Sequence, residues 1–176
     1  MLRQSGHPSS RLPCWFSGGG SPTETPGSDL RKCIEREFLD RGAPLVQVRT
    51  MILSKDHSAA YVEFMARSLY QNDGRLKPTP GGQFFLEQTF ADAAKMLWAL
   101  WTHAPTLDSI TLKVFRRPLL TTETKEEAIL LLRATDKVLK DEALNWGKTS
   151  PLALLQQGEL QCELDPRLGL RAMKEE

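Results

Sequence analysis

The chain has 176 residues, of which 40% are hydrophobic and 26% are charged, a globular composition with enough length for one domain around its own core. Its 23 lysines and arginines nearly cancel its 22 aspartates and glutamates, so no net field attracts nucleic acid or an acidic membrane. No apolar run in the sequence reaches the roughly 20 residues that span a bilayer, so no transmembrane helix is expected.

Residues 1–27 are rich in Ser, Gly and Pro and have no hydrophobic periodicity. Because such a segment cannot bury enough apolar area to offset chain entropy, we predict a disordered N-terminal tail. Within it, Cys14 and the flexible sequence that follows resemble a lipoprotein cysteine with its tether, although Arg11, Leu12 and Pro13 do not form a lipobox. No standard signal peptide is expected, so the cytoplasm is favoured; a lipid-anchored or secreted envelope protein is the alternative if the start site is mis-assigned.

The ordered domain is expected over residues 28–166, with a C-terminal tail over 167–176. Ser28 is a good helix N-cap, and Gly42 and Pro44 supply a stop. Between them, apolar side chains fall at helical spacing on one side: Leu30, Cys33, Ile34 and Phe38. This spacing predicts a short amphipathic helix.

Two strands are predicted next, over residues 45–53 and 59–69, joined by the turn-rich segment 54–58. Strict alternation places every second side chain on the core. The expected core-facing residues are Val46, Val48, Thr50 and Ile52 in the first strand and Val62, Phe64 and Ala66 in the second. The opposite face then mixes polar, apolar and aromatic side chains, as in an antiparallel sheet with one wet or partly covered side.

Residues 71–82 form the longest internal loop, which Pro78 and Pro80 hold extended. A solvated connection is the simpler interpretation, but loops of this length are often functional. An enzyme or small-ligand site at this loop would use Asp73, Arg75 and Lys77.

A helix over residues 84–101 and a third strand over 107–115 follow, with Pro105 between them. The helix is expected to be buried over more than half of its circumference because its apolar stripe is wide. The strand YVEF, the Ala-rich helix and the segment LDSITLKV resemble small envelope-associated bacterial domains of the GerMN type in sporulation and germination proteins. The resemblance ends with this hairpin, helix and strand and includes no functional motif, so it implies a similar fold core only.

A capping box at Thr124–Glu127 and the apolar stripe beyond it predict one helix that ends at Asn145. Ser150 and Pro151 then begin a second, short helix. Clean alternation over 159–165 predicts a last strand, whose charged side suits an exposed face or a sheet edge.

Together these elements predict one α+β domain in the order α-β-β-α-β-α-α-β. A four-stranded mixed sheet, built on the hairpin-helix-strand core, carries three to four helices mainly on one face. No internal repeat is visible in the sequence.

The sequence contains no motif that indicates an enzyme, a cofactor or a metal. Phosphate-binding glycine loops and the nucleophile elbow are missing, and the 3 histidines lie apart from other metal-ligating side chains. The 3 cysteines favour one unpaired tail residue, Cys14, and two buried ones, although a disulfide between Cys33 and Cys162 stays open. We therefore predict no catalytic residue, no cofactor and no metal ligand, and enzymatic activity stays uncertain with a negative leaning.

One set of residues remains for function, on the side of the sheet opposite the predicted core. It combines cations with aromatic and sulfur-containing side chains: Arg49, Tyr61, Met65, Arg67, Lys113 and Phe115, with Arg116 at the strand end. Such a set suits base stacking and phosphate contacts, but Glu63 interrupts it and no RNP-type motif is present, so contact with protein is favoured.

The sequence thus predicts a non-enzymatic protein-interaction or structural domain, with a protein partner or a second copy of the chain as its ligand. The alternatives are a small-ligand or enzyme site at the 71–82 loop and weak binding of single-stranded nucleic acid through the sheet face. Each alternative uses a different surface chemistry, so the exposed face of the sheet is the observation that separates them.

Overall fold

The computed structural model describes residues 26–67, 82–117, 126–135, 137–145, 147–166 and 169–174. Helices and strands occupy most of these ranges. In chain order they are α1 (Pro26–Glu37), β1 (Leu39–Asp40), β2 (Ala43–Pro44), β3 (Gln47–Leu53), β4 (Ala59–Met65), α2 (Gly82–His103), β5 (Ser109–Arg116), β6 (Glu127–Ala134), α3 (Lys137–Leu144), α4 (Pro151–Leu155), β7 (Glu159–Gln161), β8 (Leu164–Asp165) and β9 (Gly169–Leu170).

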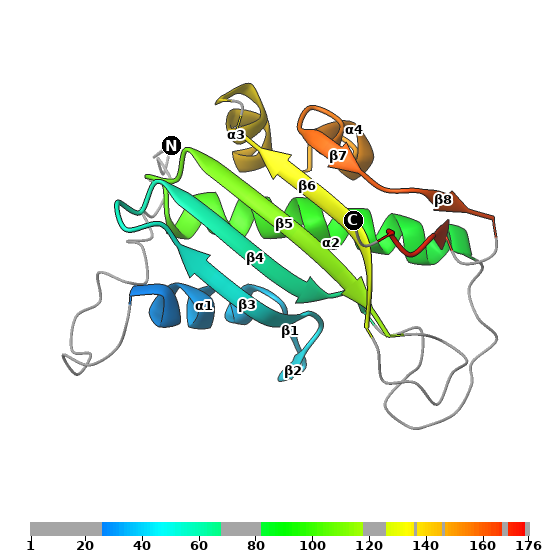
Figure 1. Cartoon of the computed structure of the whole chain (residues 1–176). Helices are drawn as coiled ribbons and strands as arrows, with labels where there is room; N and C mark the ends of the chain where they lie inside the picture. Colours follow the sequence, from blue (N-terminus) through cyan, green and yellow to red (C-terminus); the bar gives the residue numbers. More distant parts are fainter. Residues whose placement is uncertain are drawn as a thin grey trace, which may run out of the picture.

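In this described part of the chain, five strands form one mixed sheet in the order β3-β4-β5-β6-β7. The strands β4 and β5 are parallel, and the other neighbours are antiparallel. A parallel connection needs a crossover, which α2 supplies. The helix α2 runs behind the sheet, with α1 on one side of it and α3 and α4 on the other (Figure 1). The result is a two-layer α+β domain, as the sequence predicted.

The hydrophobic core lies between α2 and the sheet. On the helix side, the largest buried side chains include those of Trp101, Leu97 and Leu100 of α2, each at most 1% exposed. They belong to the same core as Leu112 and Val114 of β5. The helix is buried on several sides because α1, α3 and α4 also pack on it. This confirms the prediction that its apolar surface covers more than half of its circumference.

The predicted helix before Asn145 is wrong over its first half. Residues Glu127–Ala134 form strand β6, antiparallel to β5, and the helix α3 begins only at Lys137. The apolar run from Ala128 to Leu132 fits either a helix stripe or a buried strand, and pairing with β5 decides for the strand. The sheet therefore has five strands where four were predicted. Two strands, β5 and β6, lie between α2 and α3 in the chain, where one strand was predicted.

A bulge in β3 corrects the predicted face of its second half. The register between β3 and β4 shifts between Val48 and Thr50, so the extra residue is Arg49. Past the bulge, Met51 and Leu53 pack against the core, whereas Ile52 is 57% exposed. The placement of Thr50 and Ile52 in the core was therefore wrong, because one extra residue exchanges the two faces of a strand.

The last elements follow the sequence more closely. Ser150 caps α4, since its hydroxyl oxygen accepts a hydrogen bond from the Ala153 backbone N–H at 3.3 Å. The strand β7 lies at the edge of the five-stranded sheet, beside β6. These results confirm the predicted helix start and a strand at the sheet edge. The predicted strand over 159–165 is divided, however, because β7 ends at Gln161 and Leu164–Asp165 pair with β9.

The segment assigned to a C-terminal tail packs onto the start of α2. Leu170 is fully buried in the core, and Gly169 lies so close to Gly82 that an added Cβ would come within 2.2 Å of its carbonyl oxygen. The Arg116 guanidinium donates a hydrogen bond of 2.5 Å to the Leu170 carbonyl. Residues 169–170 therefore connect the end of β5 with the beginning of α2.

Candidate functional site: the outer face of the sheet

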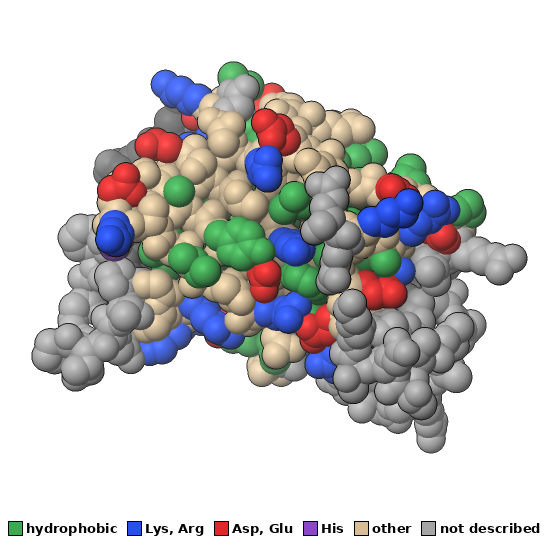
Figure 2. Space-filling view, in the orientation of Figure 1, with side chains coloured by type: hydrophobic (Ala, Val, Ile, Leu, Met, Phe, Trp, Pro, Cys, Tyr) green, Lys and Arg blue, Asp and Glu red, His purple; other side chains and the backbone are tan. Residues whose placement is uncertain are grey.

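The side of the five-stranded sheet that points away from the helices is called the outer face below. Figure 2 shows this face, with hydrophobic side chains in the middle and Lys, Arg, Asp and Glu side chains among and around them. Strand register arranges the residues in rows across the sheet. The rows are Thr50-Glu63-Lys113-Leu131-Gln161, then Ile52-Tyr61-Thr111-Arg133-Glu159, and finally Gln47-Met65-Phe115-Ala128.

At one end of the outer face, Arg49 reaches across the sheet. Its guanidinium carbon lies 4.2 Å from the centroid of the Phe115 ring, and its Nη2 lies 2.8 Å from Glu126 Oε2. This side chain therefore crosses β4 to join β3 with β5. On β4, Met65 is the register partner of Phe115 and is only 7% exposed, although it lies outside the main core cluster. Arg49 is already engaged by Phe115 and Glu126.

The middle of the outer face holds charges that do not pair with each other. Glu63 and Lys113 are direct register partners, yet no ion pair joins them. Instead the Tyr61 hydroxyl donates a hydrogen bond of 2.7 Å to Glu63 Oε1, and the Lys113 ammonium lies 5.2 Å from the Phe115 ring centroid. Burial, followed by the hydrogen bond and charge of Glu63, raises the pKa of Tyr61 to about 12. Among the described side chains, no carboxylate lies within ion-pair distance of Lys113.

Two of the predicted outer-face cations point to the helix side. Arg67 follows the end of β4 and binds Asp92 of α2, and Arg116 is 8% exposed and donates a hydrogen bond of 3.0 Å to Glu127. The strand β4 ends at Met65, so alternation no longer fixes the direction of Arg67. Arg116 directly follows Phe115 in β5, so its side chain points to the opposite face of the sheet. Their placement on the outer face is therefore corrected.

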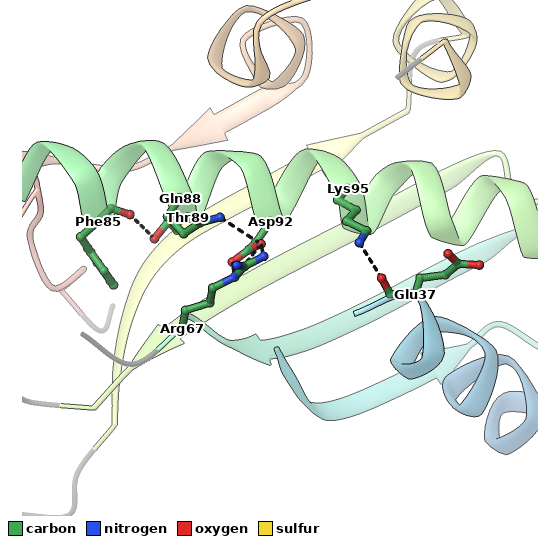
Figure 3. Close-up of polar contacts among 7 residues, drawn as sticks. All are labelled: Glu37, Arg67, Phe85, Gln88, Thr89, Asp92 and Lys95. Atoms are coloured by element: carbon green, nitrogen blue, oxygen red, sulfur yellow. Dashed lines mark hydrogen bonds and ion pairs between the residues drawn. The ribbon is translucent and has the colours of Figure 1, made fainter. Parts of the chain in front are cut away.

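The contact of Arg67 with Asp92 is a two-pronged ion pair (Figure 3). Arg67 Nη2 lies 2.7 Å from Asp92 Oδ1, and its Nε lies 2.8 Å from Oδ2. Burial raises the pKa of Asp92, which is 1% exposed, while Arg67 acts in the opposite direction. Further along the helix, Lys95 donates a hydrogen bond of 2.5 Å to the Glu37 carbonyl. These polar contacts fasten β4 and α1 to α2 and have a structural role.

The remaining predicted groups divide into three cases. The loop residues Asp73, Arg75 and Lys77 lie outside the described residues. Cys162 carries a free thiol whose pKa is raised by burial, so the disulfide between it and Cys33 that the sequence left open does not form. Cys33 is nevertheless disulfide-bonded, so the prediction that it is an unpaired buried residue is wrong. Within the described ranges, no group of three or more His, Cys, Asp or Glu side chains is arranged to hold a metal ion.

Sequence reasoning missed three members of the outer face. Ile52 was assigned to the core because the bulge at Arg49 has no sequence signal of its own. Leu131 was assigned to a helix, and Glu126 was placed within the capping box at its start. The alternation of β5 would have found Leu131 only after β6 had been recognised as its neighbour.

No family model, curated protein or solved structure matches this chain. None of the helices in the described ranges combines the length and apolar character that crossing a membrane requires. The geometry of the outer face is therefore the basis for a functional proposal.

Proposed function

We propose that this protein is a non-enzymatic interaction domain that binds a protein partner through the outer face of its sheet. The observation that carries the proposal is apolar surface that no described helix covers: Ile52 on the edge strand β3 is exposed, and Tyr61 and Leu131 are half-buried. Beside Tyr61 and Leu131 lies Lys113, which has no carboxylate partner among the described side chains. The described helices all pack on the opposite side (Figure 1). Aromatic side chains, Met and Arg are enriched in protein-binding patches, and the outer face carries Tyr61, Phe115, Met65 and Arg49.

Addition of a partner strand to the sheet edge fits less well than contact with the face. At β3, the Arg31 Nη2 donates a hydrogen bond of 2.6 Å to the Val48 carbonyl, and Gly27 of α1 lies close to the Met51 carbonyl. At the other edge, β7 has only 3 residues. Pairing with an added strand needs a row of free backbone N–H and C=O groups at the sheet edge. The contacts from α1 at β3 and the short length of β7 reduce the number of such groups at both edges.

Contact with protein is favoured over single-stranded nucleic acid by the partners of the cations. Arg49 is paired with Glu126, Arg67 with Asp92, and Arg116 with Glu127. Phosphate binding depends on cations that are free to replace counterions, and Glu63 adds a negative charge beside the remaining Lys113. The outer face therefore lacks the continuous positive path that a nucleic-acid backbone requires.

A photo-crosslinking amino acid at Ile52 tests the proposal, because this side chain is 57% exposed on the outer face, on its edge strand β3. The matched control carries the same group at Leu152 of α4, which is 40% exposed on the helix layer. We expect an adduct with a protein from position 52 and none with that protein from position 152, with the crosslinked peptide mapped by mass spectrometry. The absence of adducts at 52, identical adducts at both positions, or an adduct with nucleic acid would overturn the proposal.

A further inference from the structure

We infer that the partner of the outer face is a second copy of this chain, packed face to face on it. The twofold axis lies between the two facing sheets, runs parallel to the strands, and is centred over the gap between β4 and β5. The inference rests on the proposed function and names the occupant of the same face. Its basis is the register of Glu63 and Lys113, which are opposite charges at the same height on neighbouring parallel strands.

The symmetry follows from this register. A twofold rotation about an axis along the strands keeps the height of every residue and exchanges the positions of β4 and β5. Glu63 of one copy then faces Lys113 of the other, and the reverse contact forms at the same time. Two reciprocal ion pairs arise from one pair of residues, as an interface between identical surfaces requires.

Within one chain, both charges have their side chains directed to other groups. Glu63 accepts a hydrogen bond of 2.7 Å from the Tyr61 hydroxyl, and the Lys113 ammonium lies over the Phe115 ring. A carboxylate accepts several hydrogen bonds and an ammonium donates three, so both keep capacity for a partner from outside. Packed sheets lie about 10 Å apart, a gap that a Glu and a Lys side chain together can span.

The next row of the outer face gives a further contact in this arrangement. The same rotation places Tyr61 over Thr111 of the second copy, which joins an aromatic ring to a small side chain. The strands of the two sheets remain nearly aligned, as in β-sandwiches, where the angle between sheets is about 30°. Arg49 lies flat against Phe115 at 4.2 Å, so it adds to the contact surface without projecting from it.

The size of the face sets the expected strength of the dimer. The axis sets the four strands β3 to β6 against those of the second copy, whereas β7 has no counterpart. Strands of 7 and 8 residues run ~25 Å, and four strands span ~15 Å, so each copy contributes ~400 Å² of projected area. The total of ~800 Å² lies below the range of stable specific interfaces. We therefore expect a reversible dimer with a dissociation constant on the order of micromolar or weaker, in which the ion pairs mainly fix the orientation.

Charge exchange tests the contact directly. The variant Glu63→Lys opposes two lysines across the axis, and Lys113→Glu opposes two glutamates, so each should weaken self-association roughly 100-fold. A mixture of the two variants should associate, because every contact across the axis then joins a lysine to a glutamate. Sedimentation equilibrium from roughly 1 to 500 μM covers the expected range.

Controls make the result specific to the outer face. Lys148→Glu and Glu87→Lys change the same charges at exposed positions outside the outer face and should leave the dimer unchanged. Thermal melts at low concentration check that each variant is folded. A wild-type chain that stays monomeric throughout, or variants whose mixture does not associate, would overturn the second copy as partner. Adducts with a different protein at position 52 would then still support the proposed function, so the two failures are distinguishable.

Discussion

Asp92 is a buried carboxyl group whose ionised form is disfavoured by its removal from water. Burial raises its folded-state pKa above the usual value of 3.8, and the guanidinium of Arg67 offsets only part of this effect. The protonated form is therefore favoured by folding. Its stabilising contribution is fully present below pH 3.8 and is lost as the pH rises through the folded-state pKa.

Removal of Arg67 should make this pH dependence larger. Arg67→Met leaves the ionised Asp92 without its cation, and we expect a loss of about 3 kcal/mol of unfolding free energy at neutral pH, near the lower end for a broken buried pair. The lower end applies because the Arg67 side chain is 30% exposed. Near pH 4 the loss should be smaller, since the raised pKa of Asp92 increases the protonated fraction as the pH falls, and a protonated carboxyl needs no cation. Urea unfolding at both pH values measures the difference.

The double variant Arg67→Met with Asp92→Leu is the control for this prediction. It removes both charges, so most of the neutral-pH stability should return. An equal loss for Arg67→Met at both pH values would show that Asp92 does not carry the effect.

Single residues of the outer face were predictable where a strand was regular. Alternation placed Tyr61, Lys113 and Phe115 correctly, because β4 and β5 pair without any register shift from Ala59 and Ser109 to Met65 and Phe115. Alternation failed for Arg67 because β4 ends two residues before it. It was not applied to Arg116, which was regarded as lying beyond the strand, although β5 includes this residue and directs its side chain to the core face. The partners Asp92 and Glu127 come from segments that no local pattern connects with these arginines.

At the scale of elements, β6 shows where local sequence information stops. Glu, Ala, Leu and Arg favour a helix, and the run from Ala128 to Leu132 supplies an apolar stripe at either spacing. The strand forms because β5 offers a free edge and Leu130 and Leu132 reach the core from it, both fully buried. A tertiary pairing overrides the local preference, so the fifth strand could not be derived from its own sequence.

The bulge in β3 gives a second prediction at this scale. Because Arg49 is an extra residue, Met51→Thr should lower the free energy of unfolding by about 1–2 kcal/mol, whereas Ile52→Thr should change it by less than about 0.5 kcal/mol. Simple alternation would give the reverse order. Urea unfolding at a concentration below that of dimer formation compares the two variants, and a larger loss for Ile52→Thr would disprove the bulge.

At the scale of the whole molecule, the C-terminal residues close one end of the two layers. Leu170 is bound by Arg116 at the end of β5, Gly169 touches Gly82 at the start of α2, and the Met173 N–H donates a hydrogen bond of 2.7 Å to the Ala128 carbonyl. These contacts join segments that are far apart in sequence. Loss of the C-terminal residues should therefore loosen the sheet and the helix layer together.

Gly169 is the position at which this closure is most sensitive to change. Gly169 and Gly147 have positive φ angles of 80° and 97°, so an alanine at either position has a similar backbone cost of about 1–2 kcal/mol. Only at Gly169 would the new Cβ also meet a backbone oxygen, that of Gly82 at 2.2 Å, whereas nothing lies within 4 Å at Gly147. Gly169→Ala should therefore destabilise the protein more than Gly147→Ala and accelerate tryptic cleavage after Arg171. Equal melting temperatures and equal cleavage rates for the two variants would mean that residues 169–170 do not hold the layers together.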